Sequence, residues 1–209
     1  METENKHEIN LYKKIITNSP IDEITIIWME NPFKIEEIIL SNTQKTSNEI
    51  ANDKYPNAKL KKAPKKLKRI IKELNKYFNE KEAHFSLDYL NLDKLTDFQR
   101  KVLIAEFNTK KGTVNSYGQL AKLINNPKAY RAVGSALSKN PFPIIIPCHR
   151  TVKSDRTIGG FCGIKSGLKS KKTLLELEGI LVEGRKVLSN SPVVGLNKSK
   201  QKKITSYSQ

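Results

Sequence analysis

Cys148 and His149 are the residues of this chain whose types and spacing could carry out covalent chemistry. The cysteine stands next to one of only three histidines in 209 residues. An imidazole that takes the thiol proton produces a thiolate, which is the reactive form of cysteine. The pair therefore predicts a nucleophilic cysteine with a histidine base. The dipeptide by itself leaves an alternative open, in which Cys148 packs as a small buried hydrophobe and His149 is a hydrogen-bonded polar neighbour.

A run of isoleucines, residues 144–146, comes directly before this pair. Apolar β-branched runs are typical of strands buried on both faces, and Pro147 removes a backbone donor and ends the pairing. Cys148 is thus expected at the end of a buried strand. Because neighbouring side chains point to opposite sides of a regular strand, contact between Cys148 and His149 requires a turn at Pro147 or a bridging water.

Two short helices joined by a turn are predicted upstream of the cysteine. Ser116 is a favourable N-cap for the first helix, and Tyr117 lies on the apolar face of that helix. Residues 125–126 form the turn, and Pro127 is expected to begin the second helix. The two helices together are predicted to be a helix-turn-helix.

Arg131 lies almost opposite the apolar stripe of the second helix, which comprises Ala129, Ala132, Val133, Ala136 and Leu137. The exposed face carries small residues and one further cation at its edge: Gly134, Ser135, Ser138 and Lys128. A surface of this kind lets a nucleic-acid backbone come close around one long cationic side chain. The alternative is an exposed arginine without a specific role.

Glu178 follows a helix that is predicted over residues 170–177 and that ends before Gly179. In projection Glu178 falls on the buried side of this helix, whereas Glu176 is turned well away from it. A buried carboxylate needs a partner. The pattern alone fits equally well a carboxylate that merely ends the helix.

The composition favours a polyanionic partner, since 38 Lys and Arg against 21 Asp and Glu give a formal net charge of +17. Nucleic acid is the leading candidate, and solubility or anionic lipid are the alternatives. Two cysteines fit a reducing compartment, and the Cys and His spacing matches no zinc finger, so no metal is predicted. With no secretory segment and no apolar run approaching about 20 residues, we expect an intracellular, cytoplasmic protein without membrane contact.

Three segments closely resemble the O6-alkylguanine-DNA alkyltransferase family: residues 126–134 (NPKAYRAVG), 140–141 (NP) and 146–150 (IPCHR). The likeness is strong over residues 96–179, and covers the preceding segment only in size and coarse pattern. It implies an α+β fold, in which a small N-terminal ribonuclease H-like α/β domain precedes a winged-helix-like helix-turn-helix domain that carries the active site. We expect these domains at residues 1–91 and 92–184, followed by a basic, disordered tail at 185–209.

The resemblance implies that Cys148 is the nucleophile, that His149 is its base, and that Glu178 orients the histidine. Tyr117 matches a tyrosine that holds the flipped guanine and assists its departure, although core packing is a real alternative. Arg131 matches an arginine that enters the DNA stack from the minor groove and helps to extrude a nucleotide.

Asn140 matches a hinge asparagine between the recognition helix and the active-site strand, with a plain helix-ending asparagine as the alternative. Lys128 and Ser135 are expected to contact DNA beside it. Phe161 and Cys162 stand in the pocket wall, where many members have Tyr and Ser, and residues 164–166 are inserted after them. These departures leave the alkyl preference open, and Cys162 is either a second thiol near the site or a packing residue.

The segments that precede the resemblance predict a small α+β unit. We expect an opening strand within residues 9–16, a hairpin from 24–29 and 33–40, a mobile basic loop at 42–62, a last strand at 84–90 and a linker at 91–95. A helix over residues 64–78 has a solvated basic face and an apolar stripe of Leu67, Ile70, Ile71, Leu74, Tyr77 and Phe78. Thr96 is expected to cap the first helix of the second domain.

These observations predict a monomeric DNA repair protein that flips O6-alkylguanine out of duplex DNA and transfers the alkyl group irreversibly, once, to Cys148. O6-methylguanine is the chief expected substrate, O4-methylthymine is a further candidate, and no cofactor is needed.

Two rival classes of protein remain. A lesion-binding relative that transfers nothing would lack the nucleophilic cysteine, and a transcription regulator would use the same helix-turn-helix as a dimer on a preferred sequence.

Overall fold

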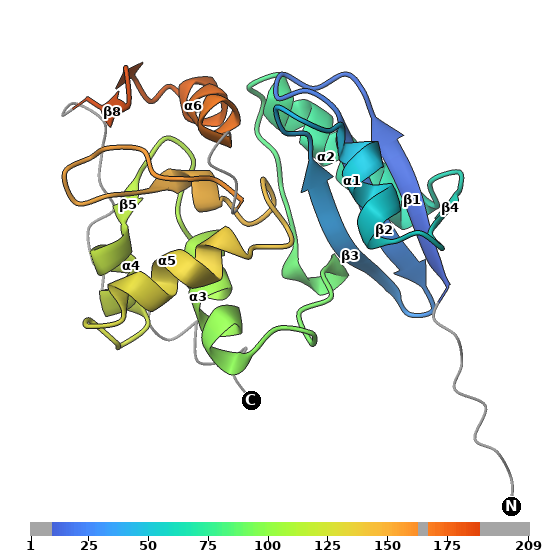
Figure 1. The fold of residues 1–209 in the computed structure, drawn as a ribbon, viewed down its shortest axis with the longest axis horizontal. Coiled ribbons are helices and arrows are strands. Elements are labelled where there is room, and N and C mark those ends of the chain that lie inside the picture. Colours follow the sequence, from blue (N-terminus) through green and yellow to red (C-terminus); the bar gives the residue numbers. More distant parts are fainter. Residues whose placement is uncertain (1–9, 163–166, 189–209) are drawn as a thin grey trace, which may run out of the picture.

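The computed structural model describes residues 10–162 and 167–188, which form a sheet flanked by helices and a second, mainly helical part (Figure 1). The sheet consists of β1 (Leu11–Ile16), β2 (Ile24–Glu30), β3 (Phe33–Leu40) and β4 (Lys59–Leu60) in the order β3-β2-β1-β4. β1 and β3 pair antiparallel with β2, and β4 is parallel to β1. The expected hairpin and opening strand are therefore confirmed for the described residues.

Alternating side chains of the sheet pack against two different helices, as the pleat of a strand requires. Ile26 and Trp28 of β2 belong to the main core together with Leu67 of α2 (Lys65–Phe78). Ile27, between them, packs on the other face with Ala51 of α1 (Ser47–Lys54). The sheet is thus covered on both faces, which explains why β2 is an almost continuous apolar run.

The helix predicted from residue 64 is confirmed as α2, and its apolar stripe faces the core. Leu67, Ile70, Leu74 and Tyr77 are buried, whereas the lysines of the opposite face are exposed. Tyr77 is the last buried member of the stripe, and it reaches the second part of the molecule, as described below.

The prediction of a mobile loop over residues 42–62 is wrong, because this segment contains α1 and β4. Thr46 and Glu49 form a capping box, in which each side chain accepts a hydrogen bond from the other residue's backbone N–H. The Glu23 carboxylate accepts two further hydrogen bonds, from the Ser47 hydroxyl and the Asn48 backbone. The polar composition concealed a helix whose start is encoded by these local hydrogen bonds.

The strand predicted over residues 84–90 is also wrong. Residues Leu87–Tyr89 form a 3-10 helix, η1, whose N-cap Ser86 accepts a hydrogen bond from the Asp88 backbone. Only Leu90 makes a β-bridge, with Ile35. The apolar pattern of this segment reflects packing against the core, because Leu87 and Leu90 are buried.

The second part begins with α3 (Asp97–Phe107), capped by Thr96 as predicted, and continues through β5 (Asn115–Ser116) to α4 (Tyr117–Leu123) and α5 (Tyr130–Ser138). It ends with η2 (Cys148–Arg150), β6 (Thr151–Val152), α6 (Leu168–Leu177) and the hairpin of β7 (Val182–Glu183) and β8 (Lys186–Val187). Ser116 caps α4 through a capping box, which confirms the first helix of the pair.

Three predictions in this part need correction. The second helix begins at Tyr130 rather than at Pro127, which lies in a turn, and Ala132 of its predicted buried stripe is exposed. Residues 144–146 are buried as expected but form a turn, closed by a hydrogen bond from Ile146 N to Phe142 O at 2.8 Å, rather than a strand. The prolines at 143 and 147 flank this turn, and each removes a donor that a strand ladder would need.

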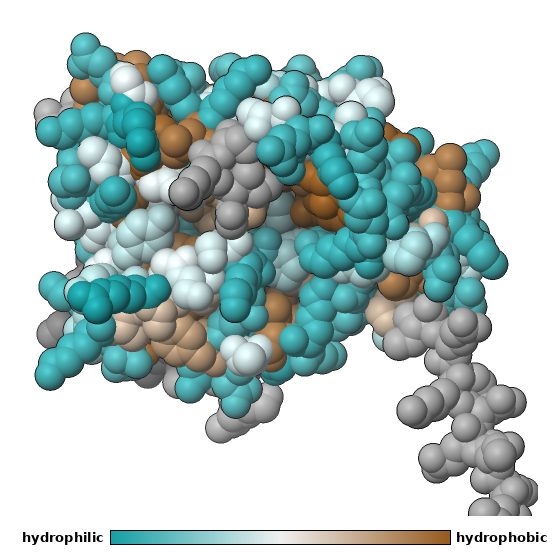
Figure 2. Space-filling view, in the orientation of Figure 1, coloured by the Kyte–Doolittle hydropathy of each residue, from teal (hydrophilic) through white to brown (hydrophobic). Residues whose placement is uncertain are grey.

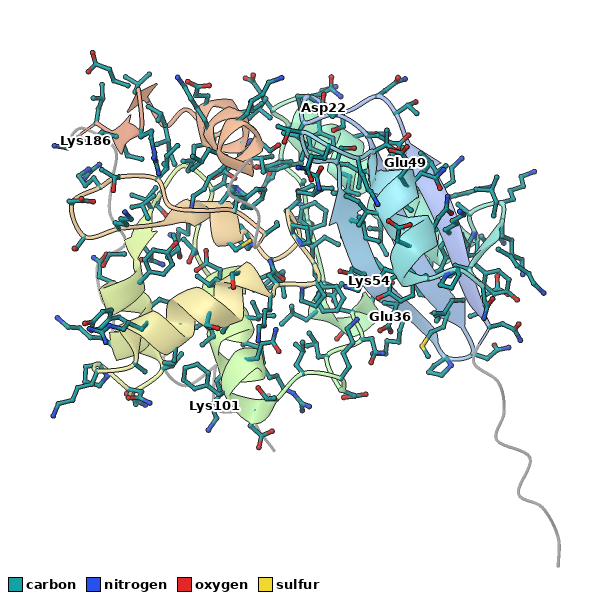
Figure 3. All side chains as sticks on the ribbon, in the orientation of Figure 1. Asp22, Glu36, Glu49, Lys54, Lys101 and Lys186 are labelled. Carbon is teal, nitrogen blue, oxygen red and sulfur yellow. The ribbon has the colours of Figure 1, made fainter. Side chains whose placement is uncertain are left out.

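The predicted disordered tail does not begin at Arg185, because Lys186 and Val187 form β8 and Val187 is buried. Residues 189–209, like the predicted insertion at 164–166, lie outside the described residues. Charged side chains such as Asp22, Glu49, Lys101 and Lys186 project from the surfaces of both parts (Figure 3). In the described ranges, no helix has the length and apolar character of a membrane span.

The capping box of α1 yields a stability prediction. Thr46→Ala removes the side-chain acceptor at the N-terminus of the helix and should lower the free energy of unfolding by about 1 kcal/mol. Urea denaturation measures this loss, with the exposed Thr43→Ala as the control that leaves the midpoint unchanged. Equal midpoints for the two variants would show that the cap contributes nothing.

Candidate active site

Cys148 opens η2 and is buried, with only 5% of its surface exposed. Its sulfur accepts a hydrogen bond from Nδ2 of Asn140 at 3.1 Å. The pKa of Cys148 is lowered, because hydrogen bonds from the Cys162 thiol and from Asn140 outweigh the effect of burial. The thiolate therefore forms more readily here than at an ordinary cysteine, as nucleophilic chemistry requires.

Asn140 connects the end of α5 to the cysteine, because it follows the helix closely in sequence and makes three hydrogen bonds around Cys148. Its Nδ2 group also donates to Ile146 O at 2.9 Å, and its Oδ1 atom accepts from Phe142 N at 3.0 Å. These bonds hold both ends of the turn at residues 142–146. Asn140 is thus more than a helix-ending residue, since it joins the turn to the sulfur.

His149 and Glu178 meet in the interior, with both side chains fully buried and Nε2 at 2.8 Å from Oε1. Burial lowers the pKa of His149 and outweighs the opposing effect of the Glu178 charge, so the imidazole is neutral near pH 7. An ionised carboxylate can only accept, so Nε2 carries the hydrogen. The lone pair of this neutral imidazole is then on Nδ1, a buried atom with no hydrogen-bond partner among the described residues.

A direct contact between Cys148 and His149 would require a turn at Pro147. This turn is present, because the backbone enters η2 at that residue. Among the described residues, no direct hydrogen bond joins the Cys148 sulfur to the His149 ring. Of the two routes that the sequence left open, a bridging water is the one consistent with these contacts.

Glu178 is held by four residues from three separate segments of the chain. Besides His149, it accepts hydrogen bonds from Nε and Nη2 of Arg150, from the hydroxyl of Tyr77 and from the backbone of Gly112, all between 2.8 and 3.1 Å. Burial alone would raise the pKa of Glu178, but His149 and Arg150 lower it far below its ordinary value. The carboxylate is therefore a permanent negative charge at neutral pH.

Arg150 and Tyr77 belong to this site, although the sequence did not predict a role for either of them here. Arg150 is part of the IPCHR segment, from which no role was predicted for it, and Tyr77 was predicted only to belong to the apolar stripe of α2. The Tyr77 hydroxyl lies 2.8 Å from Glu178 Oε1 and 3.2 Å from His149 Nε2. The one available signal was chemical, since a tyrosine on a buried stripe normally needs a partner for its hydroxyl.

Tyr117 begins α4 and is partly buried, with its ring against Gly134 and its hydroxyl against Gly159. A Cβ atom at Gly159 would lie 3.0 Å from this hydroxyl, so the glycine makes room for it. Burial raises the pKa of Tyr117, and the charge of Cys148 raises it further. The phenol therefore stays protonated within the electrostatic reach of the sulfur, which core packing alone does not explain.

Phe161 and Cys162 both lie at the site. The Phe161 ring packs edge-on against His149, with centroids 6.3 Å apart, and the Cys162 thiol lowers the pKa of Cys148. Cys162 is thus a second thiol in contact with the first, in addition to its packing in the core.

Arg131, Lys128 and Ser135 lie together at α5, away from the buried cluster. All three are exposed, and the Arg131 guanidinium lies over the Tyr130 ring at 5.6 Å from its centroid. Around α5 the surface is largely pale, of intermediate hydropathy, with hydrophilic side chains at its edges (Figure 2). The structure therefore confirms that Arg131 is exposed.

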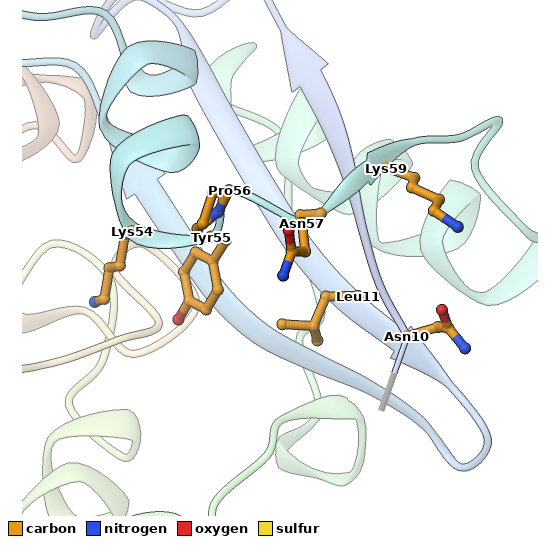
Figure 4. Close-up of a pocket in the computed structure, with 8 residues that line it drawn as sticks. Asn10, Leu11, Lys54, Tyr55, Pro56, Asn57 and Lys59 are labelled. Atoms are coloured by element: carbon orange, nitrogen blue, oxygen red, sulfur yellow. The ribbon is translucent and has the colours of Figure 1, made fainter. Parts of the chain in front are cut away.

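A separate cavity of about 740 Å³ lies in the first part, between the end of α1, the start of β1 and β4 (Figure 4). Its lining includes Lys54, Tyr55, Asn57 and Lys59 and contains none of the residues predicted for the site. In the described part of the chain, no group of three or more His, Cys, Asp or Glu residues is arranged to hold a metal ion.

Residues 97–180 match the family model described as 6-O-methylguanine DNA methyltransferase, DNA binding domain. The chain is 32% identical over 182 residues to the methylated-DNA–protein-cysteine methyltransferase of Methanothermobacter thermautotrophicus, covering 87% of this chain and 94% of that protein. This chain belongs to the same family. The human protein of that name is 43% identical over 121 residues, which cover 56% of this chain and 57% of the human protein.

Solved structures of the family share the mixed α+β fold. The Mycobacterium tuberculosis O6-methylguanine methyltransferase superposes with a TM-score of 0.66 at 30% identity, covering 80% of this chain and 92% of that one. The corresponding enzyme of Pyrococcus kodakaraensis gives a TM-score of 0.58 at 28% identity, over 81% of this chain and 99% of that chain.

The buried charge of Glu178 gives a pH-dependent prediction. Glu178→Gln should lower the free energy of unfolding by roughly 3 kcal/mol at pH 7, because Arg150 loses its anionic partner. Since the folded pKa of Glu178 is lowered, its contribution is complete above the unfolded value of about 4.3 and is lost as the pH falls below it. Urea denaturation at pH 7 and pH 3 should therefore show a smaller difference from the wild type at pH 3.

The matched control is Glu176→Gln, two residues earlier on α6, which is exposed and pairs with Lys172. This variant should unfold like the wild type at both pH values. A loss that is independent of pH in Glu178→Gln would mean that packing, and not the charge, explains it.

Proposed function

We propose that this protein repairs DNA by transferring the alkyl group of O6-alkylguanine irreversibly to its own Cys148. The observation that carries the proposal is a thiol whose pKa is lowered, next to a neutral histidine that is oriented by a buried carboxylate. Membership of the methyltransferase family supports the same chemistry. We expect O6-methylguanine as the chief substrate and O4-methylthymine as a further one, without a cofactor.

The proton of Cys148 passes to Nδ1 of His149 through a water molecule, and Glu178 stabilises the imidazolium that forms. The sulfur then attacks the alkyl carbon, so that an S–C bond forms and the bond from that carbon to O6 of guanine breaks. The electron pair of the broken bond goes to the guanine, which takes a proton from the Tyr117 hydroxyl or from water. The product is a thioether, which no group in the described ranges is placed to reverse, so each molecule acts once.

DNA binds at α4 and α5 in this proposal, with Arg131 filling the space of the flipped nucleotide and Lys128 and Ser135 contacting the backbone. The exposure of Arg131 among small residues supports this role. A related M. tuberculosis structure, with a TM-score of 0.63 and 29% identity over 81% of this chain and 92% of that chain, was solved in complex with DNA. Asn140 links this helix to the cysteine, and Phe161 and Cys162 line the pocket of the base.

The finer architecture is part of the same proposal. Residues 1–91 form an N-terminal domain of ribonuclease H-like type, and a winged-helix-like domain starts at residue 92. The second domain extends through the β7–β8 hairpin, beyond the boundary at 184 that the sequence suggested. We expect a cytoplasmic monomer that does not bind membranes.

Transfer to Cys148 can be tested with a duplex that carries labelled O6-methylguanine. At most one equivalent of label should become bound to each protein molecule, and peptide mass spectrometry should locate it on Cys148. Cys148→Ser should bind the duplex and acquire no label, whereas Cys162→Ser should still acquire one equivalent. Sustained turnover, or label on another residue, would refute the proposal.

Arg131→Ala tests the DNA face. Without the side chain that fills the stack, the transfer rate should fall by roughly tenfold to a hundredfold, which corresponds to a few kcal/mol of unstacking energy. Transfer from free O6-methylguanine base should be unchanged, because the chemical site is intact. Lys101→Ala, an exposed cation on α3, is the control. If Arg131→Ala repairs the duplex at the wild-type rate, the assignment is wrong.

A further inference from the structure

Glu106 of α3 is a buried acid that the mechanism above does not use. It has no exposed surface, although charged side chains are rarely buried without compensation. Its Oε2 atom accepts a hydrogen bond from the Thr151 hydroxyl at 2.6 Å. Its Oε1 atom has no hydrogen-bond partner among the described residues. A single neutral donor is poor compensation for a carboxylate charge in the interior.

Lys171 of α6 is a buried cation at the same place, with 1% of its surface exposed. Its Nζ atom donates a hydrogen bond to Thr151 O at 2.6 Å. Thr151 directly follows η2, so both charged side chains contact the residue that comes next after the Cys148 segment. No ion pair within 4.0 Å joins Glu106 to Lys171 in the described part of the chain, so this cation has no fixed anionic partner.

The other charged groups near Glu106 are already paired. Arg150 on η2 and Glu178 at the end of α6 neutralise each other through three hydrogen bonds. Tyr117 on α4 is neutral, because its pKa is raised by burial. The groups that can supply a negative charge to stabilise the Lys171 ammonium are then the Glu106 carboxyl and the thiols of Cys148 and Cys162.

The titration behaviour agrees with this arrangement. Burial raises the pKa of Glu106 to about 7, against the opposing effects of Thr151 and Lys171. The charge of Glu106 raises the pKa of Cys148, and the charge of Lys171 lowers it. Ionised Glu106 and the Cys148 thiolate therefore disfavour each other, while both are favoured by the same ammonium.

We propose that Glu106 is a positioning residue for alkyl transfer, which stays protonated while Cys148 is a thiolate and ionises once the thiolate has been consumed. This inference rests on the proposed function, because it concerns the charge that the reaction removes. When the S–C bond forms and the guanine leaves with the electron pair of the C–O6 bond, the sulfur becomes neutral. Lys171 then lacks an anion, and Glu106 releases its proton to solvent and replaces the lost charge.

This exchange has two consequences for the protein. Before the reaction Glu106 is neutral, so the positive charge of Lys171 stabilises the Cys148 thiolate without competition from a carboxylate. The sulfur therefore stays reactive. After the reaction, an ionised Glu106 prevents Lys171 from becoming an uncompensated buried charge, which would destabilise the alkylated protein.

The pH dependence of transfer from an O6-methylguanine duplex tests the first consequence. Glu106→Gln keeps an oxygen that can accept the Thr151 hydrogen bond but cannot ionise. The midpoint of the rate against pH should move to lower pH than in the wild type, with a several-fold faster transfer on the acidic side. Glu176→Gln removes the same charge from the surface and should keep the wild-type midpoint. An unchanged midpoint in Glu106→Gln overturns the proposal.

Carboxyl-carbon NMR of the wild-type protein labelled with 13Cδ-glutamate tests the second consequence and needs no variant. Glu106 is the glutamate expected to titrate near neutral pH, since its pKa is about 7. After methylation of Cys148 this titration should move down by about one unit or more, because the thiolate is gone and Lys171 remains. A titration that stays in place overturns the proposal even if Glu106→Gln does not fold.

The two proposals can fail separately. If the wild-type protein acquires no methyl group from the duplex, the proposed function is wrong. If it acquires one equivalent and the Glu106 titration does not move, repair stands and only the role of Glu106 is refuted. Thermal unfolding gives a further measure, since methylation should lower Tm more in Glu106→Gln than in the wild type.

Discussion

The site depends on the compensation of one buried negative charge, the carboxylate of Glu178. His149, Arg150, Tyr77 and Gly112 each donate to it, and they come from three segments that lie far apart in the chain. A carboxylate away from water is stable only when such donors surround it, so the interaction fixes the relative positions of α2, η2, the loop at Gly112 and the end of α6. Because the ionised carboxylate can only accept a hydrogen bond, the neutral His149 ring carries its hydrogen on Nε2. Nδ1 is then the basic atom of the ring. Stability and chemistry are therefore linked through a single group.

The contact of Tyr77 with this carboxylate gives the N-terminal part a place in the active site. Its ring completes the apolar stripe of α2, while its hydroxyl reaches His149 and Glu178. A residue that packs in one part and donates in the other holds the histidine only when both parts are folded. The main hydrophobic core is accordingly continuous between them, since it contains Trp28 and Leu67 as well as Leu120 and Cys148.

Two buried charge systems contact η2 or the residue that follows it, and they differ in how they are balanced. Glu178 and Arg150 are matched by direct, short hydrogen bonds, so their charges are permanent. Glu106 and Lys171 both contact Thr151 and not each other, which leaves the cation available to the sulfur. A permanent pair orients the base, and a loosely matched pair can respond when the reaction removes a charge. This difference explains why only the second system is expected to titrate near neutral pH.

The sequence by itself determined the helices α2 to α5, because apolar periodicity and the caps at Thr96 and Ser116 are local properties. Chemical type and helical projection also pointed to Cys148, His149, Glu178 and Arg131, but their expected roles came from the resemblance to the alkyltransferase family. The sequence failed where the outcome depended on distant partners: residues 144–146 are buried as a turn and not as a strand, and residues 84–90 pack on the core with a single β-bridge, from Leu90 to Ile35 of β3, and not as a strand. Only the tertiary structure decided that Tyr77 and Arg150 reach Glu178, that Cys162 contacts Cys148, and that Glu106 and Lys171 meet at Thr151. Burial and charge compensation arise between segments far apart in the chain, and no local pattern encodes them.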